Sequence, residues 1–282
     1  MRSCNILVSF AEGELEVEKF LGVPGWRVLL DSGAYANFTR DLGITVEAYI
    51  EFLQQHRSAF WRYFALDKIA DAAVSRANLQ RMLRAGLNPI PVFQRGGLVA
   101  DLDELREVSD VLAVGGIAGR LNKKADRRYL HQLIRAAAGH RLHLLGCGNV
   151  EVLTRYRPYS ADSSSHATRH GDLRIWDGTR FRLLQWKARR TPTLDRVPVA
   201  EQRVSFGKLC ESYGIDPART AERDFFMSFD AKVMSLRSYM RFQASLRKLG
   251  TEYFIALVDA DRRPAIAAWE LERDHEDMRT TA

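Results

Sequence analysis

Short apolar segments alternate with amphipathic segments along the first 160 or so residues of the chain. The apolar runs predict strands at residues 5–10, 26–35, 61–67, 88–94, 110–119 and 141–148, with a seventh ending in YSAD at 159–162. The segments between them repeat apolar positions with the period of a helix, at about 45–56, 71–84, 101–109, 124–138 and 151–157. Strict alternation of strands and helices is typical of a parallel sheet covered by helices.

About seven such strands, each ending in a polar or glycine-containing turn, favour an α/β fold of the TIM type. We therefore expect a (β/α)8 barrel, which need not be regular, over residues 1–196. This region includes a basic hairpin that turns at Asp177-Gly178. Residues 197–282 carry amphipathic patterns, such as 230–249, and predict a helical C-terminal appendage packed on the barrel.

Composition narrows the class of protein but not its function. The 282 residues are 46% hydrophobic and 27% charged, which is ordinary for a soluble globular protein. Cys4, Cys147 and Cys210 are too few and too scattered for a disulfide framework or a four-cysteine zinc site. No apolar run reaches the roughly 18 residues of a membrane helix, and the N-terminus does not read as a secretory signal. We expect a cytoplasmic protein without membrane contact.

The positive charge is concentrated in one segment. Between Arg169 and Arg196, eight Lys and Arg residues stand against three Asp residues, with three aromatic residues interleaved. Clustered cations attract phosphates, and aromatic rings can stack on bases. The alternative is a solvated hairpin whose aromatic rings face the core. On the first interpretation the nucleic-acid-binding residues are Arg169, Arg174, Arg180, Arg182, Lys187, Arg189 and Arg190.

Polar side chains mark the ends of the predicted strands. Asp31, Asp67, Gln94 and Asp162 each follow or end an apolar run. Active sites of TIM-type barrels lie at the carboxyl ends of the strands, so these four side chains are expected on one face. An aspartate after a strand also commonly caps the next helix, and this alternative applies to each one taken singly. Three carboxylates on one face would repel each other unless a proton or a substrate compensated them.

Two glycine-rich turns, a serine run and a histidine pair are further candidate site features. GGIAG at 115–119 and GCGNVE at 146–151 do not complete the dinucleotide-binding pattern and are also consistent with tight turns. The serines that follow Asp162 are positioned to hydrogen-bond its carboxylate. His166 and His170 have a spacing that could chelate a metal on a helix, but Gly171 argues against a helix there.

The order of these motifs resembles a known family. DSGAY, LD, PVFQ, GGIAG, LGCG and a strand-end aspartate follow one another as in the tRNA-guanine transglycosylase superfamily. The likeness is greatest to its phage and bacterial branch, which inserts 7-deazaguanines into DNA, and it covers roughly residues 26–180. This resemblance implies a pentosyltransferase that exchanges a base at the C1′ atom of a nucleoside.

The resemblance also implies a role for each site residue. Asp162 would be the nucleophile that holds the sugar covalently, and Asp31 the general acid and base. The base-binding residues would be Tyr35, Asp67, Gln94, Gly116, Ile117 and Leu145, with Tyr35 and Leu145 on either side of the ring. General chemistry supports the roles of Asp162 and Asp31, because retaining glycosidases also pair a carboxylate nucleophile with a protonated carboxyl group. A carboxylate and an amide also complement the edge of guanine.

One departure from the family bears on the substrate. The tRNA-acting enzymes carry a zinc site of three cysteines and a histidine after the nucleophile, whereas Cys210 is the only cysteine after Asp162. We therefore expect DNA and a free 7-deazaguanine base as partners, with no metal and no cofactor. The alternatives are a tRNA-acting transglycosylase, a non-catalytic nucleic-acid-binding barrel and, with less support, a metal-dependent hydrolase. The sequence identifies neither the incoming base nor the oligomeric state.

Overall fold

The chain folds into two compact units, seen here in a computed structural model. The model describes residues 3–97, 99–118, 124–137, 139–167, 172–186, 192–194, 199–222 and 224–280. One unit comprises residues 2–163 and 246–259, and we call it the barrel unit. The other comprises residues 164–245 and 260–282, and we call it the hairpin unit.

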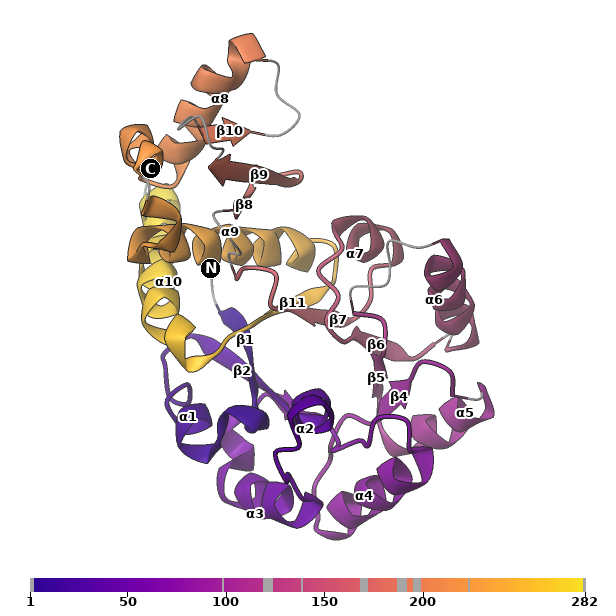
Figure 1. Cartoon of the computed structure of the whole chain (residues 1–282). Coiled ribbons are helices and arrows are strands. Elements are labelled where there is room, and N and C mark those ends of the chain that lie inside the picture. Colours follow the sequence, from indigo (N-terminus) through magenta and orange to yellow (C-terminus); the bar gives the residue numbers. More distant parts are fainter. Residues whose placement is uncertain are drawn as a thin grey trace. The chain divides into compact units, whose positions relative to one another are not determined.

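The barrel unit is built on an eight-stranded parallel sheet, with helices α3 to α6 around the outside of the strands (Figure 1). In sheet order the strands are β3, β2, β1, β11, β7, β6, β5 and β4. The outer strands β3 and β4 are linked by a parallel bridge between Phe64 and Ile90, where the N–H of Ala65 donates to the carbonyl of Ile90 at 2.8 Å. The fold is therefore an irregular TIM-type (β/α)8 barrel, which confirms the predicted class.

The strands are short, as expected for an irregular barrel. Their bounds are β1 Cys4–Ser9, β2 Trp26–Asp31, β3 Arg62–Tyr63, β4 Val92–Gln94, β5 Val111–Gly115, β6 Arg141–Leu144, β7 Ser160–Ser163 and β11 Glu252–Ala256.

The eighth strand comes from a distant part of the sequence. β11 lies between β1 and β7, with Ile255 beside Ile6 and Phe254 beside Asp162. The division therefore differs from the one predicted at residue 196, because residues 252–256 belong to the barrel sheet and the hairpin falls in the other unit. The signal missed in the sequence is the run EYFIALV at 252–258, which follows Gly250 and reads as a strand.

The helices of the barrel unit follow the strands in the expected alternation. They are α1 Glu14–Glu18, α2 Ala34–Arg40, α3 Val46–His56, α4 Ala72–Arg84, α5 Val99–Val108, α6 Lys124–Ala136 and α7 Val150–Tyr156. Thr45 caps α3 by accepting a hydrogen bond from the N–H of Ala48 at 3.2 Å. Asp71 caps α4 in the same way through the N–H of Val74, at 3.0 Å.

Apolar side chains from β1, β2, β5 and β11, together with residues next to β3 and β4, form a core within the barrel unit. Its buried members are Leu7, Leu29, Phe64, Ile90, Val111, Ala113 and Phe254. Burying aliphatic and aromatic side chains is the main favourable term in folding, so this core fixes the positions of the strand ends that carry the polar residues.

The hairpin unit combines a small antiparallel sheet with long helices. The strands β8 Asp172–Trp176, β9 Phe181–Trp186 and β10 Pro192–Leu194 pair in the order β10, β9, β8, and the helices are α8 Val199–Ser212, α9 Phe229–Arg247 and α10 Asp259–Thr280. The N–H of Asp177 donates to the carbonyl of Arg180 at 3.0 Å, which confirms the predicted hairpin turn. In the described parts of the chain, no helix is long and apolar enough to cross a membrane.

Candidate active site at the carboxyl ends of the barrel strands

Four of the side chains predicted for the site lie at the carboxyl ends of barrel strands. Asp31 is the last residue of β2 and Gln94 the last of β4, while Asp162 lies in β7 and Asp67 follows β3. Strands of a parallel barrel end at the same face, so the fold brings these residues to one end of the barrel unit.

Asp162 is a buried carboxylate with two hydrogen-bond donors. His143 Nε2 lies 3.0 Å from Oδ1, and the main-chain N–H of Gly146 donates to the same atom at 3.0 Å. Both hydrogen bonds use Oδ1, and Oδ2 accepts none from the described residues. The donors are therefore His143 and Gly146, and not the serines after Asp162 as the sequence suggested.

His143 is the main residue of this site that sequence reasoning missed. It lies on β6 opposite Ser160 on β7, and its Nδ1 is 2.8 Å from Ser160 Oγ. Ser160 and Asp162 are two residues apart on one strand, so both side chains point to the same face and both reach His143. A carboxylate can only accept, so Nε2 donates to Asp162, and Nδ1 shares a hydrogen bond with the Ser160 hydroxyl. A histidine between leucines in the predicted strand at 141–148 was the available signal.

Asp31 is held by its neighbours on the adjacent strand and turn. Ser9, which pairs with Asp31 between β1 and β2, donates through Oγ to Oδ2 at 2.8 Å, and the N–H of Gly33 donates to the same oxygen at 3.0 Å. Burial raises the pKa of the Asp31 carboxyl above its ordinary value. The hydrogen bond from Ser9 opposes this change, and the negative charge of Asp162 adds to it. Asp31 and Asp162 both lie toward the carboxyl ends of their strands, so the fold brings them to the same end of the barrel unit.

Asp67 and Gln94 form a second polar pair. Gln94 Nε2 donates to Asp67 Oδ2 at 2.5 Å. Burial raises the pKa of Asp67 to about 6, against the effect of the hydrogen bond from Gln94, and the charge of Asp31 raises it further. Gly115 lies beside Gln94 in the sheet, and a Cβ at Gly115 would fall 2.7 Å from Gln94 Nε2. The absence of a side chain at position 115 therefore leaves room for the Gln94 amide.

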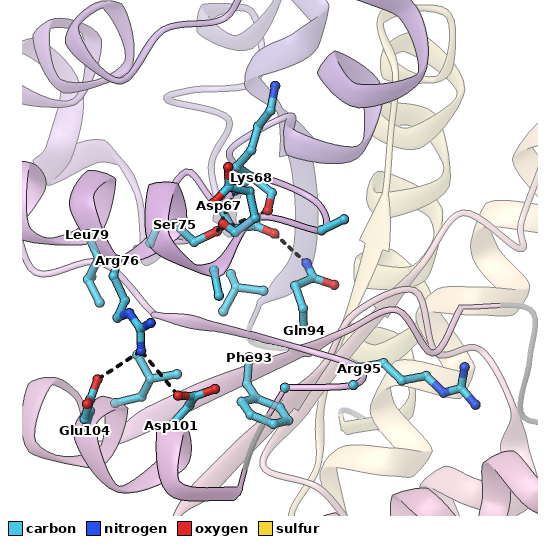
Figure 2. Close-up of a pocket in the computed structure, with 18 residues that line it drawn as sticks. Asp67, Lys68, Ser75, Arg76, Leu79, Phe93, Gln94, Arg95, Asp101 and Glu104 are labelled. Carbon is cyan, nitrogen blue, oxygen red and sulfur yellow. Dashed lines mark hydrogen bonds and ion pairs between the residues drawn. The ribbon is translucent and has the colours of Figure 1, made fainter.

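A cavity of about 270 Å³ adjoins this pair, between α4 and α5 (Figure 2). Asp67 and Gln94 lie at one end of it, and Arg76, Asp101 and Glu104 line the other. Leu79, Phe93 and Leu105 supply apolar parts of its lining.

The remaining predicted base-binding residues have different surroundings. Tyr35 lies on α2 and is 72% exposed, so its ring is available for stacking. Leu145 is half-buried and packs against the barrel core, and Ile117 is fully buried. Gly116 has a φ of 72°, a conformation that favours glycine. Placement of the ring between Tyr35 and Leu145 stays a prediction.

The aromatic rings described in the basic hairpin pack inside its own unit. Trp176 is buried against Phe242, with ring centroids 4.7 Å apart, and Phe181 stacks on Tyr239 at 4.5 Å. These two rings are therefore core residues, as in the alternative interpretation of the segment, and are not displayed for base stacking.

The cations of the hairpin are only partly described. Arg182 is paired with Asp177 at 2.5 Å, and Arg180 lies 3.8 Å from the same carboxylate. Burial alone would raise the pKa of Asp177, but hydrogen bonds from Arg180, Thr179 and Arg182 lower it to about 2. Arg174 is exposed and hydrogen-bonds Tyr239. The predicted contacts of Arg169, Lys187, Arg189 and Arg190 lie outside the described residues.

Cysteine and histidine residues do not assemble into a metal site in the described part of the chain. There, no group of three or more His, Cys, Asp or Glu side chains is placed to hold an ion. His166 is buried and its Nε2 lies 3.2 Å from Asp261 Oδ2, while His170 lies outside the described residues. The three thiols are free, and burial raises the pKa of each to about 12, which makes them unreactive.

Comparisons with protein-family models, curated proteins and solved structures find no match to this chain.

Proposed function

We propose that the chain is a base-exchange transglycosylase that replaces guanine in DNA with a 7-deazaguanine through a covalent aspartyl-glycosyl intermediate. One observation carries the proposal: Asp31, the last residue of β2, and Asp162 in β7 lie at the same end of the barrel unit, and each accepts its hydrogen bonds from the described residues through one oxygen only. Asp162 would be the nucleophile, because His143 and Gly146 hold Oδ1 while Oδ2 accepts no hydrogen bond from the described residues. Asp31 has a raised pKa, which favours the protonated acid. A double displacement at an anomeric carbon requires one group of each kind.

In the first half-reaction, Asp162 Oδ2 attacks C1′ of the target nucleoside. The C1′–N9 bond breaks, its electron pair passes to the departing guanine, and the proton of Asp31 neutralises that base. The sugar remains attached to Asp162 as an ester, and Asp31 is left as a carboxylate. Oδ1 stays hydrogen-bonded to His143 and Gly146, which holds the carboxylate while its other oxygen reacts.

In the second half-reaction, the Asp31 carboxylate removes the N9 proton of the incoming 7-deazaguanine. N9 then attacks C1′, the ester bond breaks, and its electron pair returns to Asp162. Asp31 ends the cycle protonated, as it began, so protons and electrons balance over the two steps.

Asp67 and Gln94 supply the groups that would select the base. The Asp67 carboxylate oxygens accept from N–H groups, and the Gln94 amide both donates and accepts. Guanine and 7-deazaguanines share the N1–H and 2-amino donors and the O6 acceptor, so one site can serve the departing and the incoming base.

The preference for DNA rests on the cysteine positions. Cys210 is the only cysteine after Asp162 and is buried, so the zinc element of the tRNA-acting enzymes that the sequence resembles has no counterpart here.

Mass spectrometry of digested nucleosides tests the proposal. DNA and tRNA are purified from cells that express the chain or its Asp162→Asn variant and that are supplied with 7-deazaguanines. We expect a deazaguanine nucleoside in DNA with the parent and none with the variant. A modified nucleoside confined to tRNA would overturn the DNA assignment, and its absence from both polymers would overturn the reaction.

A further inference from the structure

The cavity between α4 and α5 reaches from the base-selecting pair to the surface of the barrel unit. Its inner end is Asp67, which is 8% exposed, and its outer end includes Glu104, whose side chain is 66% exposed (Figure 2). The barrel therefore offers a connection to the outside beside the base-selecting pair, between two helices.

The lining of the cavity suits a small planar base and disfavours a phosphate. Ligand pockets usually span about 300–1,000 Å³, so a cavity of about 270 Å³ holds a single base more readily than a nucleotide. Leu79, Phe93 and Leu105 provide apolar surface along it. Four carboxyl side chains line it, Asp67, Asp71, Asp101 and Glu104.

Three cations also line the cavity, Lys68, Arg76 and Arg95, and the two arginines are ion-paired. Arg95 extends away from the cavity in Figure 2 and is ion-paired with Asp126 at 2.5 Å, and Lys68 also points away. Carboxylates therefore dominate the cavity, and they accept from the N–H donors that guanine and 7-deazaguanine both carry.

The inner rim of the cavity is held by hydrogen bonds and contains a residue with a strained backbone. Ser75 Oγ accepts from the N–H of Lys68 at 2.8 Å and donates to the carbonyl of Asp71 at 2.7 Å, which fixes the loop between β3 and α4. Within this loop Ala70 has a φ of 62°, an unfavourable conformation for alanine. Strain of this kind persists where surrounding contacts enforce it, and it is concentrated at functional sites.

A single arginine bridges the outer end. Arg76 on α4 lies 3.3 Å from Asp101 and 3.6 Å from Glu104, both on α5. All three side chains are partly exposed, and exposed ion pairs are weak, so this bridge can open at little cost.

We propose that this cavity is the entry and exit site of the free base, an inference that rests on the proposed function. While the sugar is bound to Asp162, the nucleic acid lies over the strand ends where that residue is held. The departing guanine must still leave, and the incoming base must still arrive, before the intermediate is resolved. The cavity supplies a path that the polymer does not cover, and it leads directly to Asp67 and Gln94.

Two variants that fill the cavity, with a matched control, test the inference. Leu105→Trp fills it from α5, and Ala72→Phe fills it from α4 at an exposed position, where the added ring does not disturb the core. Glu107→Trp places the same bulk on an exposed position of α5 that does not line the cavity. Thermal unfolding establishes that each variant is folded.

Labelled guanine is the probe, in two measurements. The first is its incorporation into a guanine-containing oligonucleotide, and the second is its equilibrium binding to the protein without nucleic acid. We expect both cavity variants to slow incorporation about tenfold or more, because base exchange becomes rate-limiting. Binding without nucleic acid should stay within about twofold of the parent, since the strand ends are then open, and Glu107→Trp should leave both quantities unchanged.

The remaining outcomes separate the inference from the proposed function. Parental incorporation rates in both cavity variants would overturn the entry site and leave the reaction standing. An equal loss of binding and incorporation would also overturn the entry site, because the cavity would then affect the site where the base binds and reacts, and not the path to it. A parent that incorporates no guanine into DNA or tRNA would overturn the reaction, and the entry site with it.

Discussion

Asp31 and Asp162 accept their hydrogen bonds in the same way, through one carboxylate oxygen each. Ser9 and Gly33 both donate to Asp31 Oδ2, and His143 and Gly146 both approach Asp162 Oδ1. The second oxygen of each carboxyl group accepts nothing from the described residues. One oxygen thus fixes the orientation of the group, and the other is available to a substrate.

Asp162→Asn is expected to abolish exchange and leave the fold intact. An amide still accepts hydrogen bonds through its oxygen but cannot form a glycosyl ester, so the rate should fall by about four orders of magnitude or more. The measurement is the covalent adduct with an oligonucleotide on a denaturing gel. Asp110→Asn is the control, because Asp110 precedes β5 at the other end of the strands and pairs there with Arg62. An adduct with the Asp162 variant would disprove the nucleophile.

His143 is expected to act by positioning Asp162. His143→Phe removes one of the two donors to a carboxylate, a contact worth about 1.5–3 kcal/mol, so adduct formation should slow by roughly 10- to 100-fold. His143→Gln keeps an N–H donor on a side chain of similar reach and should restore most of the rate. Single-turnover adduct formation over a range of pH measures this effect. Equal losses in both variants would indicate a packing role only.

Asp67 is expected to reduce the stability of the folded protein at alkaline pH. Its pKa rises to about 6 on folding, from an unfolded value of 3.8, so the folded protein binds this proton more tightly and loses stability as the pH rises. Asp67→Asn should therefore be more stable than the parent by on the order of 2–3 kcal/mol at pH 8, and the difference should shrink below pH 6 and vanish below pH 3.8.

Urea unfolding at several pH values checks this expectation. Asp110→Asn is the matched control with the opposite sign, because the hydrogen bond from Arg62 lowers the pKa of Asp110. This variant should be less stable than the parent at pH 8, and the loss should shrink as the pH falls. A pH-independent difference for Asp67→Asn would contradict the prediction.

The residues at strand ends could be predicted from sequence, whereas their hydrogen-bond partners could not. Asp31, Asp67, Gln94 and Asp162 were placed on one face because parallel strands end at one edge. Contacts such as Ser9 with Asp31 depend on strand register, which no single strand specifies. The cavity depends on how the side chains of α4 and α5 pack, and this is not visible in a periodic pattern.

At the scale of elements, tight turns after the strands bring main-chain N–H groups to the carboxylates. The turn after β2 presents the N–H of Gly33 to Asp31, and the turn after β6 presents that of Gly146 to Asp162. Both glycines have positive φ, 79° and 64°, and a Cβ at either would fall within 2.8 Å of an alanine Cβ. The glycines in DSGAY and LGCG therefore meet a conformational and a steric requirement together.

Gly146→Ala is expected to destabilise the protein and to impair exchange. The Cβ would lie 2.7 Å from the Cβ of Ala118, in addition to the cost of positive φ, so we expect a loss of about 2 kcal/mol or more. Gly86→Ala, with a φ of 74° and open space around it, should lose only about 1 kcal/mol. Thermal unfolding measures both, and Ala118→Gly should partly restore the Gly146 variant. A lack of rescue would argue against the clash.

At the scale of the whole molecule, the barrel is assembled from both ends of the sequence. Strand β11 hydrogen-bonds to β1 on one side and β7 on the other, so without it the sheet has two unpaired edges next to Asp162. Sequence reasoning found the strands that alternate with helices. It missed β11, because the long hairpin unit separates this strand from the repeating pattern.

A chain that ends at residue 249 is therefore expected to lose the barrel. Amide hydrogen exchange at Ile6, Leu7 and Val8 of β1 reports on this, because unpaired or unfolded amides exchange rapidly. A chain that ends at residue 258 keeps β11 and lacks α10 equally, so it is the control and should retain protection in β1. Protected amides in the shorter chain would show that β1 and β2 are stable without β11.

The position of β11 also sets the order of events during synthesis on the ribosome. Ile6 pairs with Ile255, which lies 249 positions later in the chain, so the barrel cannot close until residue 255 has been translated. Until then β1 and β7 expose strand edges of the kind that promote aggregation. Pairings so distant in sequence also fold slowly, because the loop between them must close first. Newly made chains should accordingly depend on chaperones more than a barrel whose strands are completed in sequence order.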